Sequence, residues 1–431
     1  MDTGASNQFV ALEPTAHMTT RRKAILATVI GSGLEWFDFS GYAFFAAIIG
    51  KLFFPAGNET TSLLLALATF GVGFVMRPLG GIVFGIYADK VGRKRALSLA
   101  MLVMALGSAV IAFAPTYESI GLAAPCLIVV ARMLQGLSAG GEMGGATAFL
   151  TEHAPVNRRA FYSSWIQTSV GFAVVIGSIT GAVITSSLSP ESLTSWGWRV
   201  PFIIGMLVAP VGYYIRLKIE ETPEFASEKR HTNTPLRDVI REYPRGVLSS
   251  LLMVVLWTVC TYVILFYIPT YVVKYLHMPQ REGFISGVVS GAVLMAMAPV
   301  FGALSDRVGK QRVLTSAAIV ILIASYPLFS HLIKSPTFGM LLAFQVIFGV
   351  LIAAYTGPTL ALFTEMFPSR VRTTGLSLAY NGAVTIFGGF ASFIITWLTQ
   401  ATGDAESASY YIIFAAVVSL LGTRLIKPYK S

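Results

Sequence analysis

The chain has 431 residues, of which 12% are charged and 55% are hydrophobic, and its formal net charge is +10. Soluble domains carry roughly 25% charged residues, so a soluble protein of this length would lack the charges needed to cover its surface. The composition argues against an ordinary cytosolic enzyme and predicts a polytopic membrane protein whose exterior faces lipid.

Continuous apolar runs recur along the chain after a polar stretch at residues 1–20, which we expect to form a cytoplasmic tail. The first run contains Glu35 and Asp38, so it is interpreted as a retained span and not as a cleaved signal peptide. Helices are favoured over barrel strands, because strands would alternate in polarity over about ten residues. The runs predict twelve transmembrane helices, at residues 24–50, 61–87, 96–114, 122–150, 160–186, 199–218, 246–273, 283–304, 313–333, 338–363, 373–400 and 409–426.

The positions of the Lys and Arg residues predict how these helices are oriented. Most of them fall in the tails and in every second loop, where residues 90–95 and the linker at 219–245 are the richest segments. The positive-inside rule then places both termini in the cytoplasm. It also accounts for the net charge without a nucleic-acid partner. The predicted division is a tail at 1–20, a six-helix bundle at 21–218, a cytoplasmic linker at 219–245, a second six-helix bundle at 246–426 and a tail at 427–431.

Two loop patterns occur twice, once in each half of the chain. The segment Gly85–Lys94 returns as Gly302–Lys310, with its Gly, Asp and basic residues at the same spacing. The second pattern is an acid, a proline and two arginines: Glu152, Pro155, Arg158 and Arg159, then Glu365, Pro368, Arg370 and Arg372. Internal repeats of this kind are typical of secondary transporters.

The repeated pattern Gly-x-x-x-Asp-Arg/Lys-x-Gly-Arg/Lys resembles the signature of the major facilitator superfamily. Further segments resemble its metabolite–proton symporter group: Gly33–Phe39, Met76–Gly80, Arg132–Glu142, Trp196–Phe202 and Glu220–Phe225. Within that group, the segments that look most like citrate or tricarballylate carriers are Phe149–Glu152, Phe161–Trp165 and Arg372–Gly389. The resemblance implies an all-α fold of twelve transmembrane helices in two pseudo-symmetric six-helix bundles. It also implies alternating access, import of a small carboxylate with protons, a bacterial inner membrane with its lipids as the setting, and a monomer.

Acids and bases of the repeated loops are expected to form two cytoplasmic gate networks. The residues are Asp89, Arg93, Glu152 and Arg158 in the first half, and Asp306, Arg307, Glu365 and Arg372 in the second. Glu152 is expected to pair with Arg93 and Arg158, and Glu365 with Arg307 and Arg372. Such pairs would hold the outward-open state. The alternative is that these charges only anchor the loops through the positive-inside effect.

Five charged residues fall deep inside predicted spans, and all belong to the first half: Glu35, Asp38, Arg77, Arg132 and Glu142. An ionisable residue at this depth costs several kcal/mol, so it usually faces a cavity and has a function there. The second half offers neutral polar groups instead: Tyr262, Tyr267, Tyr271, Gln345, Tyr355, Tyr380 and Asn381. We therefore expect the first half to handle protons and charge, and the second to complete the substrate site.

Glu35 and Asp38 are three residues apart and share a helix face. Two neighbouring carboxylates resist simultaneous ionisation at low dielectric, so one would hold the coupling proton. The alternative is a permanent pair with Arg77 or Arg132. Glu142 is assigned either to proton coupling or to a structural pair.

Arg132 is the expected substrate anchor, because a guanidinium grips a carboxylate through two parallel hydrogen bonds. Arg77 would bind a second carboxylate, or would pair with Glu142 or Asp38. Gln167, Tyr355 and Asn381 are predicted hydrogen-bond donors to the anion.

No phosphate-binding loop for ATP is found, and neither a metal nor another cofactor is expected. The alternatives that stay open are a carrier of a dicarboxylate, a shikimate-like acid or a zwitterionic osmolyte such as proline or betaine. A channel and a membrane-embedded enzyme are more remote. The residues do not distinguish protons from sodium as the coupling ion.

Overall fold

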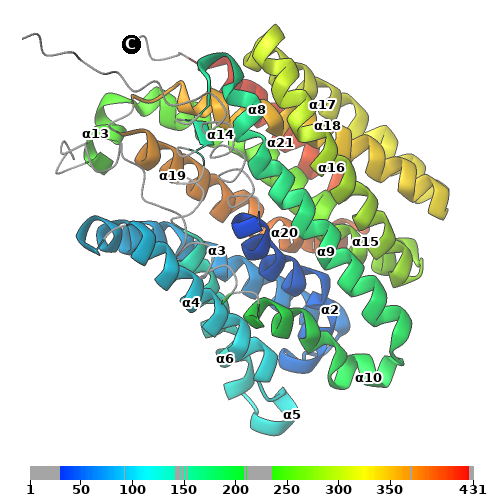
Figure 1. Ribbon diagram of the computed structural model, residues 1–431. Helices are drawn as coiled ribbons and strands as arrows, with labels where there is room; N and C mark the ends of the chain where they lie inside the picture. Colours follow the sequence, from blue (N-terminus) through cyan, green and yellow to red (C-terminus); the bar gives the residue numbers. More distant parts are fainter. Residues whose placement is uncertain are drawn as a thin grey trace, which may run out of the picture.

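The structure is a computed structural model, and it describes residues 30–91, 93–140, 147, 150–151, 154–207, 210, 235–368 and 371–426. Helices make up most of this part of the chain, and it contains no strand. They run as long, roughly aligned rods through the molecule (Figure 1).

The first half contains a broken first span and several long helices. The described elements are a helix at residues 30–44, α2 (Ala46–Phe53), α3 (Glu59–Val91), α4 (Arg93–Phe113), α5 (Tyr117–Ile120), α6 (Ala123–Ala139), η1 (Val156–Arg158), α8 (Arg159–Ser163), α9 (Trp165–Ser187), α10 (Pro190–Ser195) and η2 (Gly197–Arg199), which continues as a helix to residue 207. Phe45 forms a turn inside the predicted first span, so that span is two helices and not one.

The second half begins with a short helix and continues with the remaining spans. Its elements are α13 (Pro235–Glu242), α14 (Pro244–Cys260), the π-helical η3 (Thr261–Tyr267), α15 (Ile268–Leu276), α16 (Gln280–Val308), α17 (Lys310–Lys334), α18 (Phe338–Thr364), α19 (Arg372–Ala383), the π-helical η5 (Val384–Gly388), α20 (Ala391–Thr402) and α21 (Ser407–Arg424).

Within the described residues, 8 helices are long and apolar enough to cross a membrane. Shorter apolar helices at Ser98–Phe113, Ala123–Ala139 and Gly197–Leu207 match the predicted third, fourth and sixth spans. Helix ends agree closely with the sequence pattern, as for α18, which was predicted at 338–363. The agreement follows from the bilayer itself, since each span must be apolar over the whole hydrocarbon thickness.

Close helix packing in the first half depends on residues without side chains. α3 and α6 lie so near each other that a Cβ on Gly136 would collide with the Gly73 carbonyl, and a Cβ on Gly81 would lie 3.2 Å from the Gly140 oxygen. Apolar side chains gain little by leaving lipid, so small residues that let backbones touch are a main source of helix association. This contact sets the distance between Arg77 on α3 and Arg132 on α6.

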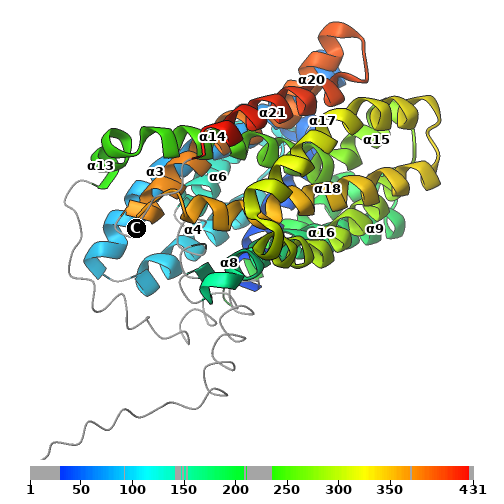
Figure 2. The ribbon, with the colours of Figure 1, turned by 90° about the horizontal axis from the view of Figure 1, so that it is seen from above.

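The two halves meet along two seams. α9 of the first half lies beside α16 of the second (Figures 1 and 2), and Thr168 Oγ1 donates a 3.2 Å hydrogen bond to the Met295 carbonyl across this seam. The other seam joins α3 and α6 to α19, η5 and α20. There Thr385 Oγ1 donates to the Phe74 carbonyl at 2.8 Å, and Asn381 Nδ2 donates to the Gly140 carbonyl at 3.0 Å.

The π-helical segments η3 and η5 interrupt the spans that the sequence predicted as continuous at 246–273 and 373–400. Side chains from neighbouring helices donate to carbonyls inside both segments. The Tyr411 hydroxyl donates to the Phe387 carbonyl at 2.9 Å, and Gln345 Nε2 lies 3.4 Å from the Ile264 carbonyl. Single-turn π segments occur frequently at functional sites, and both of these adjoin the buried charges described next.

Candidate substrate and proton site

Asp38, Arg77 and Arg132 are the charged residues buried inside the described spans, with exposed fractions of 5%, 3% and 0%. They come from three helices of the first half: residues 30–44, α3 and α6. Burying a charge is expensive unless it is paired or solvated by polar groups, so the surroundings of each one are informative.

Arg132 is enclosed by aromatic rings. Its guanidinium carbon lies 5.1 Å from the ring centroid of Phe39, 4.7 Å from that of Tyr42 and 4.6 Å from that of Phe70. Cation–π contacts of this kind are worth about 2 kcal/mol or more when desolvated. The rings therefore replace part of the hydration that the cation loses.

One edge of the Arg132 guanidinium is held by a polar chain. Nη1 donates to Gln135 Oε1 at 2.7 Å, and Gln135 Nε2 donates to Ser108 Oγ at 2.9 Å. The other edge, Nε and Nη2, has no hydrogen-bond partner among the described residues. Gly73 lies beside this edge, where an added Cβ would be 3.4 Å from Nη2 and 3.5 Å from Nε. The guanidinium is thus fixed by one edge and presents the other.

Arg77 lies on the neighbouring helix in a similar setting. Its guanidinium carbon is 5.7 Å from the Trp36 centroid, 4.7 Å from that of Phe39 and 4.5 Å from that of Phe74. The Tyr380 hydroxyl of the second half faces it. Phe39 contacts both guanidiniums, so the two cations share one aromatic wall.

The two predicted proton carboxylates differ in their surroundings. Asp38 is buried next to Ser108 and Arg132, and its Oδ1 has no hydrogen-bond partner among the described residues. Gly205 of the sixth span makes room for it, because a Cβ there would collide with Oδ1. Glu35, one turn earlier, is partly exposed. The sequence placed both on one face, and the structure separates them by burial.

Rings from the second half close over this group of charges. Trp36 stacks on Phe266 with centroids 6.1 Å apart and planes at 7°, and Tyr262 meets Phe74 edge-on at 5.2 Å. Sequence reasoning missed Gln135, Ser108 and the aromatic wall. Gln135 could have been found, since it stands three residues after Arg132 on one helix face. The rings carry no comparable signal, because aromatic residues are frequent in every span.

The predicted hydrogen-bond donors lie in three different environments. Gln167 on α9 is fully buried, and neither of its amide atoms has a partner among the described residues. Asn381 joins the two halves through its bond to Gly140. Tyr355 donates to the Met253 carbonyl at 2.7 Å, within the second half. Its hydroxyl is therefore hydrogen-bonded within the second half.

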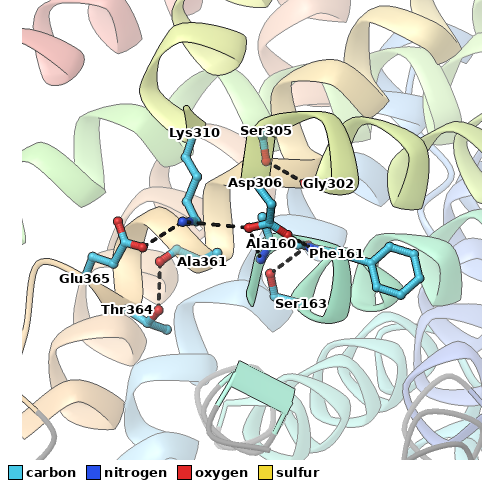
Figure 3. A network of polar contacts seen from close by, with 10 residues as sticks. All are labelled: Ala160, Phe161, Ser163, Gly302, Ser305, Asp306, Lys310, Ala361, Thr364 and Glu365. Atoms are coloured by element: carbon cyan, nitrogen blue, oxygen red, sulfur yellow. Dashed lines mark hydrogen bonds and ion pairs between the residues drawn. The ribbon is translucent and has the colours of Figure 1, made fainter. Parts of the chain in front are cut away.

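A second polar group links the ends of α8, α16, α17 and α18 (Figure 3). Both Asp306 oxygens accept backbone hydrogen bonds from the first half, from Ala160 N at 3.1 Å and Phe161 N at 2.9 Å. Lys310 Nζ lies 2.9 Å from Glu365 Oε1 and 3.8 Å from Asp306 Oδ1. A carboxylate at this point satisfies amides at a helix start that have no partner inside the helix.

The composition of this network differs from the expected one. The sequence paired Glu365 with Arg307 and Arg372, whereas the structure gives it an ion pair with Lys310. Gly309 explains the difference: its φ of 106° lies in the region that favours glycine, and it turns the chain between α16 and α17 so that Lys310 faces α18. Arg307 is exposed, and Arg372 Nε donates to the Thr364 carbonyl at 3.1 Å.

The first-half counterpart of this network is only partly described. Glu142 and Glu152 lie outside the described residues, and for Asp89 and Arg93 the structure describes the helical backbone alone. Arg158 is exposed. Within the described chain, no group of three or more His, Cys, Asp and Glu side chains could hold a metal ion.

Comparison with solved structures identifies the fold. The partially occluded inward-open xylose transporter XylE from E. coli superposes with a TM-score of 0.76 at 15% identity, covering 94% of this chain and 97% of that one. A D-xylose–proton symporter gives a TM-score of 0.75 at 17% identity, covering 92% and 96%. At these identities the likeness concerns the arrangement of helices.

Sequence comparison gives closer relatives. The citrate–proton symporter of Klebsiella pneumoniae is 38% identical over 403 residues, which cover 93% of this chain and 90% of that protein. The corresponding protein of Salmonella typhi is 36% identical, covering 94% and 93%. The proline/betaine transporter of Escherichia coli K12 is 31% identical, covering 93% and 82%. All three are transporters.

The family model described as Major Facilitator Superfamily matches residues 28–331 and, in a second match, 289–429. The matches extend over both halves and include the repeated loops, the buried arginines and both seams. Together with the helix arrangement, they show that the chain belongs to the Major Facilitator Superfamily and has its all-α transmembrane fold.

Proposed function

We propose that the protein imports a small carboxylate together with protons by alternating access, with citrate or tricarballylate as the substrate class. The observation that carries the proposal is the Nε and Nη2 edge of Arg132, which is fully buried and has no partner among the described residues. Two parallel N–H groups at one edge match the two oxygens of a carboxylate. Relatives named citrate–proton symporters support the same substrate class.

Arg77 provides a second cation for a substrate with more than one carboxylate. It shares the Phe39 ring with Arg132, and its Nε has no partner among the described residues. Two guanidiniums against the single buried carboxylate of Asp38 leave the described site with an excess of positive charge. A polyanion offsets that excess better than a neutral solute does.

Asp38 is the proposed proton site. Its carboxylate interacts electrostatically with Arg132, so its negative charge opposes the binding of an anion beside it. A proton on Asp38 removes that charge and strengthens the binding of the substrate at the unpartnered edge of Arg132. The proton and the anion then favour the same loaded state, which is the differential binding that coupling requires. Glu35, being partly exposed, would relay the proton, and sodium is the alternative coupling ion.

The proposed setting is the bacterial inner membrane, with both termini cytoplasmic and the protein working as a monomer among its lipids. In this orientation, the Asp306–Lys310–Glu365 network lies at the cytoplasmic ends of the helices. It would act as the gate that holds the inner side closed. The proposed units that rock against each other are the bundles at 21–218 and 246–426.

The test is uptake into proteoliposomes with an imposed inward pH gradient, using labelled citrate, tricarballylate, succinate, shikimate, proline and betaine. The expected result is saturable, gradient-driven uptake of a tricarboxylate. Arg132→Ala should reduce it at least 100-fold, because a charge-assisted pair worth about 3 kcal/mol is lost. Arg281→Ala, at an exposed arginine, is the matched control and should leave uptake unchanged. The proposal fails if neither a tricarboxylate nor a dicarboxylate is taken up.

A zwitterionic osmolyte is the second candidate, and the relatives named proline/betaine transporters favour it. The rings around the site are of the kind that bind quaternary ammonium groups. Here, however, Phe39, Phe70 and Phe74 already contact the guanidiniums of the protein itself. Gradient-driven uptake of betaine without citrate uptake would select this candidate.

A further inference from the structure

Tyr262 is an exception among the buried tyrosines. The others each have a polar partner: Tyr42 donates to Ala66 O at 3.1 Å, Tyr271 to Ala405 O at 2.8 Å, Tyr355 to Met253 O at 2.7 Å and Tyr411 to Phe387 O at 2.9 Å, while Tyr267 is bonded to Thr396 and Tyr380 faces Arg77. The Tyr262 hydroxyl has no partner among the described residues, although the side chain is 1% exposed. Buried polar groups are normally hydrogen-bonded.

Thr258 is a second exception, one helical turn earlier. Several buried threonines of this half donate to the carbonyl four residues before them, as Thr261 does to Trp257 at 2.9 Å and Thr356 to Ile352 at 2.8 Å. That local bond is the usual solution for a hydroxyl inside a helix. Thr258 Oγ1 makes no hydrogen bond to any described residue. Thr399, on α20, also lacks a partner among the described residues. At a spacing of four residues, Thr258 and Tyr262 share a helix face.

That face is turned toward the charged site. Tyr262 packs edge-on against Phe74, with centroids 5.2 Å apart, and it interacts electrostatically with Arg77 and Arg132. On the other side, Gly388 in η5 packs closely against both hydroxyl-bearing side chains. A Cβ there would collide with Thr258 Oγ1 and lie 2.8 Å from Tyr262 Cε2. Two buried hydroxyls without a partner among the described residues thus lie on the helix face that is turned toward the guanidiniums.

We propose that Thr258 and Tyr262 bind the hydroxyl group of a hydroxylated carboxylate, and so make the carrier prefer a 2-hydroxy acid of the citrate kind to its deoxy analogue. The assignment rests on the proposed function, in which Arg132 and Arg77 hold the carboxylates. A site built to bond a substrate hydroxyl discriminates against an analogue that lacks it, because its own buried polar groups then stay unpaired. The two hydroxyls therefore select between hydroxylated and deoxy acids, whereas the arginines select for negatively charged substrates.

The test is competition against uptake of labelled citrate in proteoliposomes. Unlabelled citrate and tricarballylate are compared, since they differ by one hydroxyl, and malate and succinate form a second such pair. Unmodified protein should bind citrate at least about 10-fold more tightly than tricarballylate. Thr258→Val and Tyr262→Phe should each lower this ratio of affinities several-fold, because each weakens the binding of citrate and leaves the binding of tricarballylate unchanged.

The matched controls remove hydroxyls that have partners within the protein. Tyr355→Phe and Thr356→Val should leave the citrate-to-tricarballylate ratio unchanged. Thr258→Ser keeps a hydroxyl and should restore most of the ratio that Thr258→Val loses. Gly388→Ala provides an independent variant that keeps both hydroxyls. Its methyl group would collide with Thr258 Oγ1 and displace it, so it should weaken the binding of citrate more than that of tricarballylate.

The outcomes separate this assignment from the function on which it rests. If unmodified protein takes up no carboxylate, the proposed function fails first. If it transports both acids but the ratio survives in Thr258→Val, Tyr262→Phe and Gly388→Ala, the hydroxyl assignment alone is overturned. Equal weakening of both acids also overturns it, because that pattern belongs to packing and not to hydroxyl recognition.

Discussion

The two halves of the molecule bury different kinds of polar group. Within the described spans, the first half buries Asp38, Arg77 and Arg132, whereas the second half buries neutral polar side chains, among them Thr258, Gln345 and Asn381. The buried carboxylate of the second half, Asp306, lies at a helix end. This asymmetry exists although the two halves carry the same loop patterns in sequence.

The difference has an energetic meaning for the proposed mechanism, in which the two halves move against each other. Separating a buried ion pair leaves an uncompensated charge, at a cost of about 3–5 kcal/mol. Because all three charges belong to one half, the distances between them stay the same when the seams between the halves open. In the proposed site, the neutral hydroxyls and amides of the other half would bind the substrate and release it at a lower cost.

The strongest way to break this comparison is to remove the carboxylate from the charged half. Asp38→Asn should abolish accumulation driven by a pH gradient, so that the internal substrate concentration only equals the external one. Exchange of labelled for unlabelled substrate should persist, because the negative charge beside Arg132 is then absent at every pH. Counterflow and gradient-driven uptake, measured in the same liposomes, distinguish the two steps.

Glu118→Gln, at an exposed acid, is the control for the loss of a carboxylate elsewhere. Glu35→Gln should slow proton delivery and still allow accumulation. Full gradient-driven accumulation by Asp38→Asn would show that the coupling proton binds at another residue.

A second prediction adds a charge to the neutral half. Asn381→Asp replaces a donor to the Gly140 carbonyl with a carboxylate that repels it. A buried group left unpaired costs about 1–3 kcal/mol and more when charged, so uptake should fall about 10- to 100-fold. Asn381→Ala removes the same bond without adding a charge, so its uptake should fall by less. Equal losses in both variants would mean that charge in this half is tolerated.

A third prediction concerns the network where the halves meet at the helix ends. Asp306→Asn weakens two hydrogen bonds from Ala160 and Phe161, and losses of this kind cost about 0.5–2 kcal/mol. The seam should then open more often. With Cys126 replaced by Ser, a cysteine placed at Ser164, beside Gly302, should react faster with a maleimide added from the cytoplasmic side.

Lys310→Met should speed this labelling by a smaller factor, because Asp306 keeps both amide bonds when Lys310 is lost. Lys334→Met, at an exposed lysine, is the control. An unchanged labelling rate in Asp306→Asn would remove this network from the gate.

The smallest expected effect lies in the packed interior of the neutral half. Tyr355→Phe deletes a hydroxyl that bonds to the Met253 carbonyl. It should cost about 0.5–1.5 kcal/mol of stability, seen as a lower melting temperature in detergent, and change uptake less than twofold. A large change in the Michaelis constant with unchanged melting temperature would support the substrate role that the sequence predicts for Tyr355.

The sequence predicted the parts of this molecule that follow from the bilayer. Span positions depend on apolar length, and the buried charges stand out because ionised residues are rare at that depth. The pairing of Lys310 with Glu365 was beyond reach, because it depends on the backbone turn at Gly309. The partners of Gln135 and the hydrogen bond from Tyr355 to the Met253 carbonyl were also beyond reach, because they depend on how helices from distant segments face one another.

The π-helical segments have a consequence for how one helix serves two sets of neighbours. Each residue of an α-helix turns the chain by about 100°, so an extra residue in a π turn shifts everything beyond it by about that angle. Before and within η3, Thr258 and Tyr262 pack against Gly388. Beyond it, Tyr271 meets Phe329 and the Ala405 carbonyl. A one-residue deletion in Thr261–Tyr267 would therefore rotate the residues after η3 by about 100° relative to those before it. The side chains at one end of the span would then face different neighbours, although its composition would be almost unchanged.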